Sequence, residues 1–202
     1  MNKAVPIAPL TAPERSAEIL GRIRTAFAEK GFDGASMQDL ARAAGMSVGN
    51  FYRYFPSKDA IIEAMVGFDM AEMQRDFANI HMSDDPLTAI RAQITQRVQG
   101  GCHEEGRLWA EITAAANRKP EIATICCAME DMVAENLLSV FARLTGLSSA
   151  ACAKRFGAHA RMIVLLVKAS AMRQPVAPDP ELTALVLRSI ETTLTEILAA
   201  RE

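Results

Sequence analysis

The sequence is poor in aromatic residues and has no long hydrophobic run. Aromatic side chains make up 5% of the 202 residues, although half of all residues are hydrophobic. The longest purely apolar run, Met162 to Val167, is far too short to cross a bilayer. Because aromatic residues favour strands whereas Ala, Leu and Met favour helices, the composition favours a helical globular protein that does not enter a membrane.

The sequence also shows no C-x-x-C spacing, and its N-terminal segment does not have the pattern of a secretory leader. The N-terminal segment MNKAVPIAPLTAPER has no sustained apolar core, so we expect no leader and a cytoplasmic location. Reduced, buried thiols are expected in such a chain. The four cysteines show no C-x-x-C spacing and are Cys102, Cys126, Cys127 and Cys152.

No catalytic or metal-binding motif stands out in the sequence. There is no H-x-x-x-H pair, no G-x-S-x-G and no phosphate-binding loop. Cys102 and His103 stand beside two glutamates, but a neighbouring Cys and His do not have the geometry of a catalytic dyad. We therefore expect no enzyme, no metal and no cofactor. A redox sensor at Cys126 and Cys127 is an alternative, although adjacent cysteines in a helix point in different directions.

Hydrophobic residues recur at helical spacing along the chain, without strand-like alternation or internal repeats. Capping residues, prolines and glycines divide this pattern into about nine helices. They are expected from Pro13 to Gly31, Ser36 to Gly45, Ser47 to Tyr54, Lys58 to about Ile80, Pro86 to Gly100, about Glu104 to Arg118, Pro120 to Gly146, Ser148 or Ser149 to about Met172, and Pro180 to Arg201.

Residues 36–58 indicate two short helices joined by a tight turn. Two helices that cross closely need a small residue in the first and a sharp turn four residues later, and Ala41 and Gly45 meet both demands. In a helix-turn-helix the second helix enters the major groove of DNA, whereas the plain alternative is a helical hairpin without that role. The expected shared core is Leu40, Met46 and Phe51.

The polar side chains of the second helix suit DNA. Asn can pair with adenine and Arg with guanine, so Asn50 and Arg53 are candidate base readers. Hydroxyl and ammonium groups suit phosphate oxygens. The candidates for phosphate contacts are Ser36, Tyr52, Tyr54 and Lys58, and Ser47 and Val48 also face outward.

Residues 36–58 resemble the DNA-binding domain of TetR/AcrR-family transcriptional regulators. They read Ser36-Met-Gln-Asp-Leu-Ala-Arg-Ala-Ala-Gly-Met-Ser-Val-Gly-Asn-Phe-Tyr-Arg-Tyr-Phe-Pro-Ser-Lys58. The preceding Phe27-Ala-Glu-Lys-Gly-Phe32 also matches, and the resemblance covers about residues 14–62. Asn50 stands where the family commonly has a small residue or Thr, which points to a different base preference. With Gly49 added from the family, the expected DNA-binding set is Ser36, Ser47, Val48, Gly49, Asn50, Tyr52, Arg53, Tyr54 and Lys58.

We therefore expect an all-α protein of about nine helices in three parts. A flexible arm covers 1–12, a helix-turn-helix DNA-binding domain covers 13–57, and a helical body for effector binding and dimerisation covers 58–202. The charges agree with this division, because residues 1–58 carry a balance of +3 and the remainder a balance of -5.

The resemblance implies a homodimer packed through the last two helices. The apolar stripe from Leu182 to Leu198 exceeds what a terminal helix needs, and the Ala-rich segment Ala158 to Ala171 allows close approach. A last helix that only covers its own core is the alternative. Two-fold symmetry would require a near-palindromic operator.

A small apolar effector would bind between the central helices. Ordinary core packing is the alternative for each apolar candidate, and His159 is expected to be a satisfied buried or interface histidine. The expected ligand-binding residues are Phe77, Trp109, Ile112, Met129, Met132, Val133, Asn136, Phe141, Met162 and Leu166, with His103, Glu111 and His159 as further polar candidates.

The expected function is a ligand-responsive transcriptional regulator, a repressor that leaves its double-stranded DNA operator when the effector binds. Rival interpretations are a DNA-bound organiser regulated by a protein partner, a redox-sensing regulator, and a helical enzyme or carrier. A body without a cavity would favour the organiser.

Overall fold

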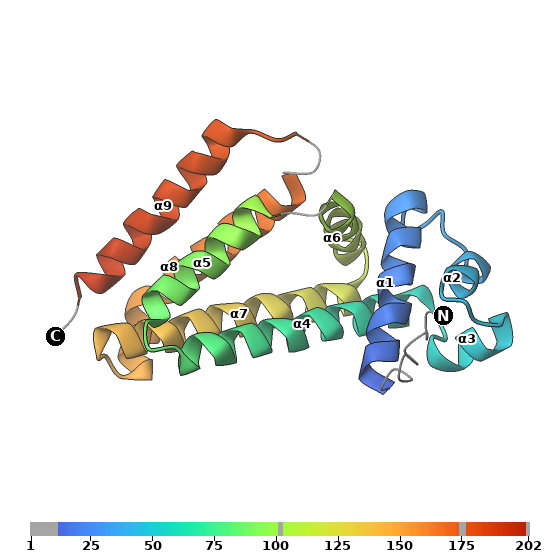
Figure 1. The fold of residues 1–202 in the computed structure, drawn as a ribbon, viewed down its shortest axis with the longest axis horizontal. Helices are drawn as coiled ribbons and strands as arrows, with labels where there is room; N and C mark the ends of the chain where they lie inside the picture. The colour runs from blue at the N-terminus through green and yellow to red at the C-terminus, as the bar shows by residue number, and fades with distance from the viewer. Residues whose placement is uncertain (1–11, 101–102, 174–176, 201–202) are drawn as a thin grey trace, which may run out of the picture. The chain divides into compact units, whose positions relative to one another are not determined.

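The computed structural model describes residues 12–100, 103–173 and 177–200, and the side chains of 17–100, 106–173 and 177–200. Over these ranges the chain forms nine helices and no strand, which confirms the expected all-α class (Figure 1). The arm expected over 1–12 lies outside the described residues except for Ala12. The helices are α1 Ala12–Lys30, α2 Met37–Ala43, α3 Val48–Tyr54, α4 Lys58–Met82, α5 Pro86–Gln99, α6 His103–Ala116, α7 Pro120–Thr145, α8 Ser149–Arg173 and α9 Pro180–Leu198.

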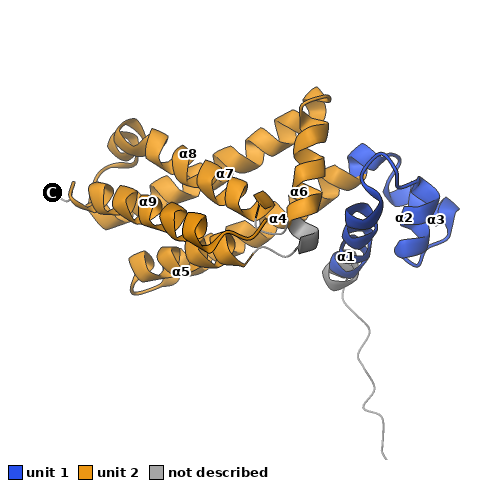
Figure 2. Cartoon of the chain, turned by 90° about the horizontal axis from the view of Figure 1, so that it is seen from above, with its two compact units in different colours: residues 1–60 blue, residues 61–202 orange. Residues whose placement is uncertain are grey.

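The chain divides into two compact units (Figure 2). The first ends at Ala60 and the second begins at Ile61, so the division falls in the first turn of α4. The sequence placed a boundary before Lys58, because a helix begins there. The side chain of Lys58 bonds to the chain between α1 and α2, which is why the first turn of α4 belongs to the first unit.

Capping side chains set the helix starts as the sequence predicted. Ser57 Oγ accepts the N–H of Ala60 at 3.1 Å, and Asp85 Oδ1 accepts the N–H of Thr88 at 3.0 Å. Ser148, rather than Ser149, caps α8, because its Oγ accepts the N–H of Ala151. Each cap satisfies an N–H that the first helical turn leaves without a partner, so these short polar residues fix where the helices begin.

The helix ends differ from expectation by a few residues. α4 continues two residues further than Ile80, to Met82, and α9 stops at Leu198 instead of Arg201. α6 ends at Ala116, where the N–H groups of Arg118 and Lys119 both bond to the carbonyl of Ala115. These shifts are of the size expected when capping geometry decides the last turn.

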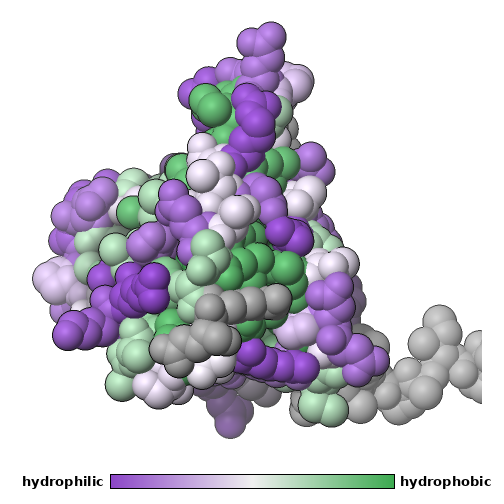
Figure 3. Space-filling model, turned by 90° about the vertical axis from the view of Figure 1, so that its left-hand side faces the viewer, coloured by the Kyte–Doolittle hydropathy of each residue, from purple (hydrophilic) through white to green (hydrophobic). Residues whose placement is uncertain are grey.

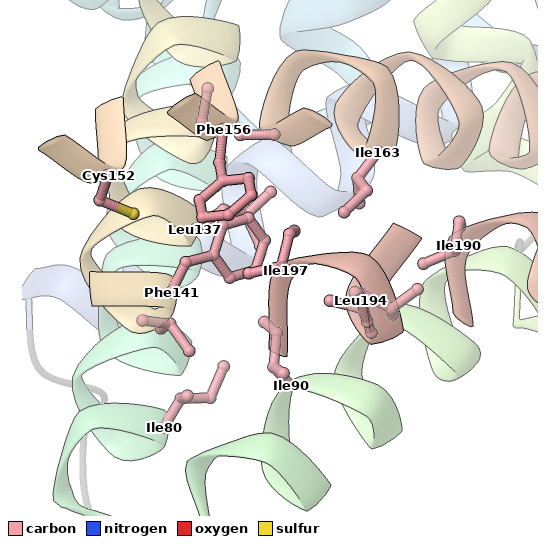
Figure 4. Packing of buried hydrophobic residues seen from close by; sticks show 14 of the residues in the cluster. Ile80, Ile90, Leu137, Phe141, Cys152, Phe156, Ile163, Ile190, Leu194 and Ile197 are labelled. Atoms are coloured by element: carbon pink, nitrogen blue, oxygen red, sulfur yellow. The ribbon is translucent and has the colours of Figure 1, made fainter. Parts of the chain in front are cut away.

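The core of the second unit joins five helices around the middle of α7. Phe141, Val140 and Ala160 are completely buried, and Ile163 is nearly so. Figure 4 shows side chains from α7, α8 and α9 converging on this cluster, with Ile80 and Ile90 approaching from α4 and α5. Removing a large side chain here would cost about 3–5 kcal/mol, so this cluster holds the helices that surround any ligand site.

Two arginines tie α5 and the end of α4 to the other helices. Arg91 on α5 forms a bidentate ion pair with Glu191 on α9. Arg143 on α7 donates to the carbonyls of His81 and Ser83, where α4 passes into the next helix. Both arginines therefore help to position the elements that line the cavity described below.

Some large hydrophobic side chains of the second unit remain exposed. Met162 and Leu165 on α8 are 40% and 60% exposed, and Leu185 on α9 is 52% exposed. Hydrophobic residues also reach the surface on the face shown in Figure 3, with hydrophilic residues around them. The single chain thus leaves apolar surface in contact with solvent, which is common for monomers but is also a feature of interfaces.

Candidate nucleic-acid interface and body cavity

The turn between α2 and α3 has the geometry that the sequence predicted. Gly45 has a φ of 68°, a left-handed conformation that glycine adopts without strain, and the N–H of Met46 bonds to the carbonyl of Ala41 at 2.9 Å. Ala41, Leu40 and Phe51 are completely buried, so the two short helices cross closely. Met46 was expected in this shared core but is only partly buried, because the turn leaves one side of it open.

A capping box holds the start of α2. Ser36 Oγ accepts the N–H of Asp39 at 3.1 Å, and Asp39 Oδ2 accepts the Ser36 N–H at 3.1 Å and the Ser36 hydroxyl at 2.6 Å. Lys30 Nζ lies 2.7 Å from Asp39 Oδ1. The hydrogen bond from Lys30, followed by those from Ser36, holds the pKa of Asp39 well below its usual range. The Ser36 hydroxyl is therefore already engaged within the chain, although its side chain is exposed.

α3 presents almost all of its side chains to solvent. Phe51 is the buried residue of this helix, and it anchors α3 to the unit. Ser47 caps the helix by accepting the N–H of Asn50 at 3.4 Å. Val48, Tyr52 and Tyr54 are 41%, 46% and 67% exposed. The expected DNA-binding residues of α3 and its N-cap are thus all exposed: Ser47, Val48, Gly49, Asn50, Tyr52, Arg53 and Tyr54.

Gly49 has no structural reason to be a glycine within this chain. It lies in the first turn of α3, and a Cβ placed on it would meet no atom within 4 Å. Its φ is not in the left-handed region. Glycine is less favourable in a helix than alanine by about 1 kcal/mol, and at this exposed position it leaves the backbone of α3 uncovered by a side chain.

Lys58 has a role that the sequence did not predict. Its Nζ donates to the carbonyl of Phe32 at 2.8 Å and to that of Asp33 at 3.1 Å, and it lies 5.5 Å from the centre of the Phe32 ring. An ammonium has three N–H donors, so one stays available after these two bonds. Lys58 therefore fastens the α1–α2 connection, and its expected phosphate contact would be made from this position.

A cavity of about 390 Å³ lies within the second unit, between α4, α5, α6, α7 and α8. Its size is in the range of sites that hold small organic molecules. Four of the core residues labelled in Figure 4 form part of its wall: Ile80, Ile90, Leu137 and Ile163. The apolar lining is Met73, Phe77, Ile80, Ile90, Ile94, Trp109, Met129, Val133, Leu137, Ile163, Val164, Val167 and Ala171.

Polar side chains form two clusters on the cavity wall. On the α4–α5 side, Asp76 Oδ2 accepts hydrogen bonds from Gln93 at 2.7 Å and from Arg97 at 3.0 Å. On the α7–α8 side, Lys168 Nζ donates to Glu130 Oε1 at 2.6 Å. Glu72 and Gln96 complete the polar lining. A ligand here would have an apolar body and a few polar contacts.

The structure brings together only part of the expected ligand-binding set. Phe77, Trp109, Met129 and Val133 line the cavity, and the other candidates do not. Ile112 and Phe141 are core residues, and Met162 is exposed. Asn136 donates to the carbonyl of Met132 in its own helix, and Leu166 packs against the core. Glu111 lies outside the lining, and the His103 side chain lies outside the described residues.

Sequence reasoning missed the charged part of the wall. Asp76, Arg97, Glu130 and Lys168 stand at helical positions next to apolar cavity residues, for example Asp76 beside Phe77. A charge at the border of an apolar helical stripe was the available signal. Such charges usually face solvent, so their position alone does not indicate a cavity wall.

Within the single chain, His159 lacks the partner expected of a satisfied buried histidine, and the alternative of an interface histidine stays a prediction. Its Nδ1 is buried and has no hydrogen-bond partner, and its Nε2 is 3.9 Å from Glu196 Oε2. The ring packs edge-on against Phe156 at 5.4 Å. Its contacts within the chain are therefore ring packing along α8 and a longer approach to Glu196 on α9.

The described residues offer little support for redox or metal chemistry. Cys126 and Cys152 are buried free thiols, and burial raises the pKa of both, which lowers the fraction of reactive thiolate. Cys127 is free and exposed. Within residues 12–100, 103–173 and 177–200, no group of three or more potential metal ligands occurs. None of the helices described is both long and apolar enough to cross a membrane.

Comparisons with known proteins agree with the helix-turn-helix. The chain is 39% identical over 70 residues to the HTH-type transcriptional regulator YuxN of Bacillus subtilis, which covers 34% of this chain and 24% of that one. It is 31% identical over 111 residues to the regulator UidR of Escherichia coli, which covers 53% and 54%. The chain therefore spans about half the length of these relatives or less. Both are named as transcriptional regulators rather than enzymes.

Solved structures extend the likeness to the whole fold. Salmonella enterica GusR is similar with a TM-score of 0.67 and 25% identity, over 94% of this chain and 98% of that one. A TetR transcriptional regulator from Legionella pneumophila has the same fold, with a TM-score of 0.71 at 16% identity over 93% and 99%. Residues 19–65, which contain the hairpin described above, match the family described as bacterial regulatory proteins, tetR family. The helix-turn-helix of this chain therefore matches that of the tetR family of bacterial regulatory proteins, and its all-α fold is shared with solved TetR regulators.

Proposed function

We propose that this chain is a dimeric transcriptional repressor that binds a palindromic operator through α3 and leaves it when a small molecule enters the cavity. The observation that carries the proposal is α3 itself. It exposes Asn50 and Arg53 around Gly49, where the helix backbone is open to close approach. A short helix with such a surface can enter the major groove.

The roles within this surface follow from side-chain chemistry. Asn50 and Arg53 read base edges, and Val48 supplies apolar contact in the groove. Tyr52 and Tyr54 donate their hydroxyls to phosphates. Ser36 and Lys58 make further phosphate contacts, for which Ser36 would exchange its bond to Asp39 and Lys58 would use its third N–H.

Dimerisation uses the exposed apolar side chains of α8 and α9. Leu165 and Leu185 expose more than half of their surface, and Met162 exposes 40%. Burying them against a second copy would remove this surface from water. A two-fold dimer presents two copies of α3 to two half-sites, so the operator would be palindromic.

The cavity of the second unit supports regulation by a small molecule. A body without a cavity would have favoured a regulator that acts only through a protein partner, and the body holds about 390 Å³ of space. The effector shifts the equilibrium between DNA-binding and released states by its differential affinity for them.

The test is selection of bound sequences from a random double-stranded DNA pool, followed by fluorescence anisotropy with the selected site. We expect a palindrome and a dissociation constant that rises steeply with salt. Arg53→Ala should relax the preference at one position of each half-site by about 1–3 kcal/mol. Arg107→Ala removes the same charge from an exposed site on α6 and should leave the preference unchanged. Failure to enrich any sequence would overturn the proposal.

A further inference from the structure

We propose that the effector is a lipophilic monocation, an apolar molecule that carries one protonated amine, and that Glu72 receives the amine. This inference rests on the proposed function only in taking the cavity as the effector site. It concerns the class of the ligand, which the fold does not determine.

The described wall of the cavity carries more negative than positive charge. Three carboxylates line it, from Glu72, Asp76 and Glu130, against two cations, Arg97 and Lys168. Both cations already have carboxylate partners, because Arg97 pairs with Asp76 at 3.0 Å and Lys168 with Glu130 at 2.6 Å. The excess negative charge therefore belongs to Glu72.

Glu72 is only weakly neutralised by the chain. Its ion pair is with Arg75 at 3.7 Å, three residues along the same helix, and the two side chains are 52% and 69% exposed. Exposed pairs of this kind contribute little, because solvent screens them. Glu72 lies four residues before Asp76, so both carboxylates lie on the same face of α4 and line the same cavity.

The existing ion pairs disfavour an anionic ligand. A ligand carboxylate beside Arg97 or Lys168 would compete with Asp76 or Glu130, which already neutralise these two cations. Weakening the Lys168–Glu130 pair, whose side chains are 24% and 30% exposed, would leave a partly buried charge less well compensated. An ammonium beside Glu72 breaks neither pair and also brings the described wall to neutrality.

The apolar part of the wall accepts the rest of the molecule. Phe77, Met129 and Val133 offer hydrophobic surface from α4 and α7, and Met side chains adapt to varied shapes. Trp109 adds an indole ring from α6. Burial of an apolar body then supplies most of the affinity, and the amine selects among apolar molecules.

Trp109 provides a direct fluorescence signal for ligand binding, because it is the single tryptophan of the chain and lines the cavity. We would titrate the full-length protein with three probes that share one phenylhexyl body: phenylhexylamine, phenylhexanol and phenylhexanoate. Quenching of the Trp109 fluorescence gives a dissociation constant for each. The amine should bind about fivefold or more tightly than the alcohol, and the carboxylate more weakly than the alcohol.

Glu72→Gln is the decisive variant, because it keeps the shape and removes the charge. It should abolish most of the advantage of the amine over the alcohol and leave the affinity for the alcohol unchanged. Glu63→Gln is the matched control, since Glu63 is an exposed residue of α4 outside the cavity wall, and it should preserve the preference. Thermal unfolding of both variants establishes that they are folded.

Three outcomes would overturn the proposal: tightest binding of the carboxylate, an amine preference that survives Glu72→Gln, or no quenching by any of the probes. The same samples are assayed for binding to the selected operator. An operator complex that phenylhexanoate dissociates, but the amine does not, would refute the cationic class and leave the regulator intact. Amine binding at Glu72 without any DNA binding would refute the regulator and leave the cationic class intact.

Discussion

Gly49 separates the requirements of folding from those of DNA binding. A Cβ at this position meets nothing within 4 Å, so Gly49→Ala should stabilise the folded protein by about 0.4–1 kcal/mol. The same methyl would stand between α3 and an approaching duplex. We expect operator affinity to fall about tenfold or more while the thermal midpoint rises.

Gly21→Ala is the matched control for this substitution. Gly21 lies within α1, and a Cβ there also meets no atom within 4 Å. The Gly21→Ala substitution should raise the free energy of unfolding by a similar amount and leave operator affinity unchanged. Equal operator affinity for the wild type and Gly49→Ala would show that the duplex does not closely approach the backbone of α3 at Gly49.

Asp39 gives the start of α2 a pH dependence. Lys30 and Ser36 hold the pKa of Asp39 below its usual range in the folded state, whereas in the unfolded chain it is about 3.9. The stabilisation from Asp39 is therefore complete above about pH 5 and is lost as the pH falls through the unfolded pKa toward the folded one. Asp39→Asn should lower the thermal midpoint at neutral pH and flatten its decline in acid. Parallel midpoint curves for the two proteins between pH 5 and pH 2 would contradict this.

The connection between α1 and α2 depends on one side chain of α4. Lys58→Met keeps the apolar stem over Phe32 but removes the two bonds from Nζ to the carbonyls of Phe32 and Asp33. Because bonds from a charged donor are worth more than neutral ones, we expect a loss of about 1–2 kcal/mol. Amide hydrogen exchange should speed up at Ala35, whose N–H bonds to the carbonyl of Gly31 in this connection.

A purely electrostatic role for Lys58 predicts a different result. Lys58→Met would then weaken operator binding and reduce its salt dependence, with no change in exchange at Ala35. A combined role would change both measurements, which is the outcome that we expect.

The local elements were readable from the sequence because their determinants are local. Ser36, Ser47 and Gly45 act within four residues of their own position, so the hairpin could be placed from its pattern. Lys58 contacts residues 25 and 26 positions away, and no spacing rule reveals such a bond. The cavity wall was only partly predicted for the same reason. Whether an apolar residue such as Phe77 or Phe141 faces a cavity or the core depends on how several helices pack together.

At the scale of the whole molecule, the apolar surface of α8 and α9 determines the oligomeric state that we propose. Leu165→Glu places a charge on a side chain that is 60% exposed in the single chain, so it should not disturb the fold of the monomer. In a dimer it would bury an unpaired carboxylate. Sedimentation velocity should show a dimer for the wild type and a monomer for the variant, with operator affinity greatly reduced.

Met82→Glu provides the comparison for that experiment. Met82 is 86% exposed at the end of α4 and belongs to neither α8 nor α9. The Met82→Glu variant should remain dimeric and bind the operator as the wild type does. A dimer that persists in Leu165→Glu would place the interface elsewhere.

The bonds of Lys58 also bear on the entropy of DNA binding. Ordering a free lysine side chain costs up to about 1.5–2 kcal/mol in lost rotamers. Folding has already immobilised Lys58 on the carbonyls of Phe32 and Asp33, so a phosphate would meet an ammonium that is already ordered. Tyr54, which is 67% exposed, would have to be ordered by the duplex itself. Of the phosphate contacts proposed for Lys58 and Tyr54, the one from Lys58 therefore carries the smaller entropic penalty on association.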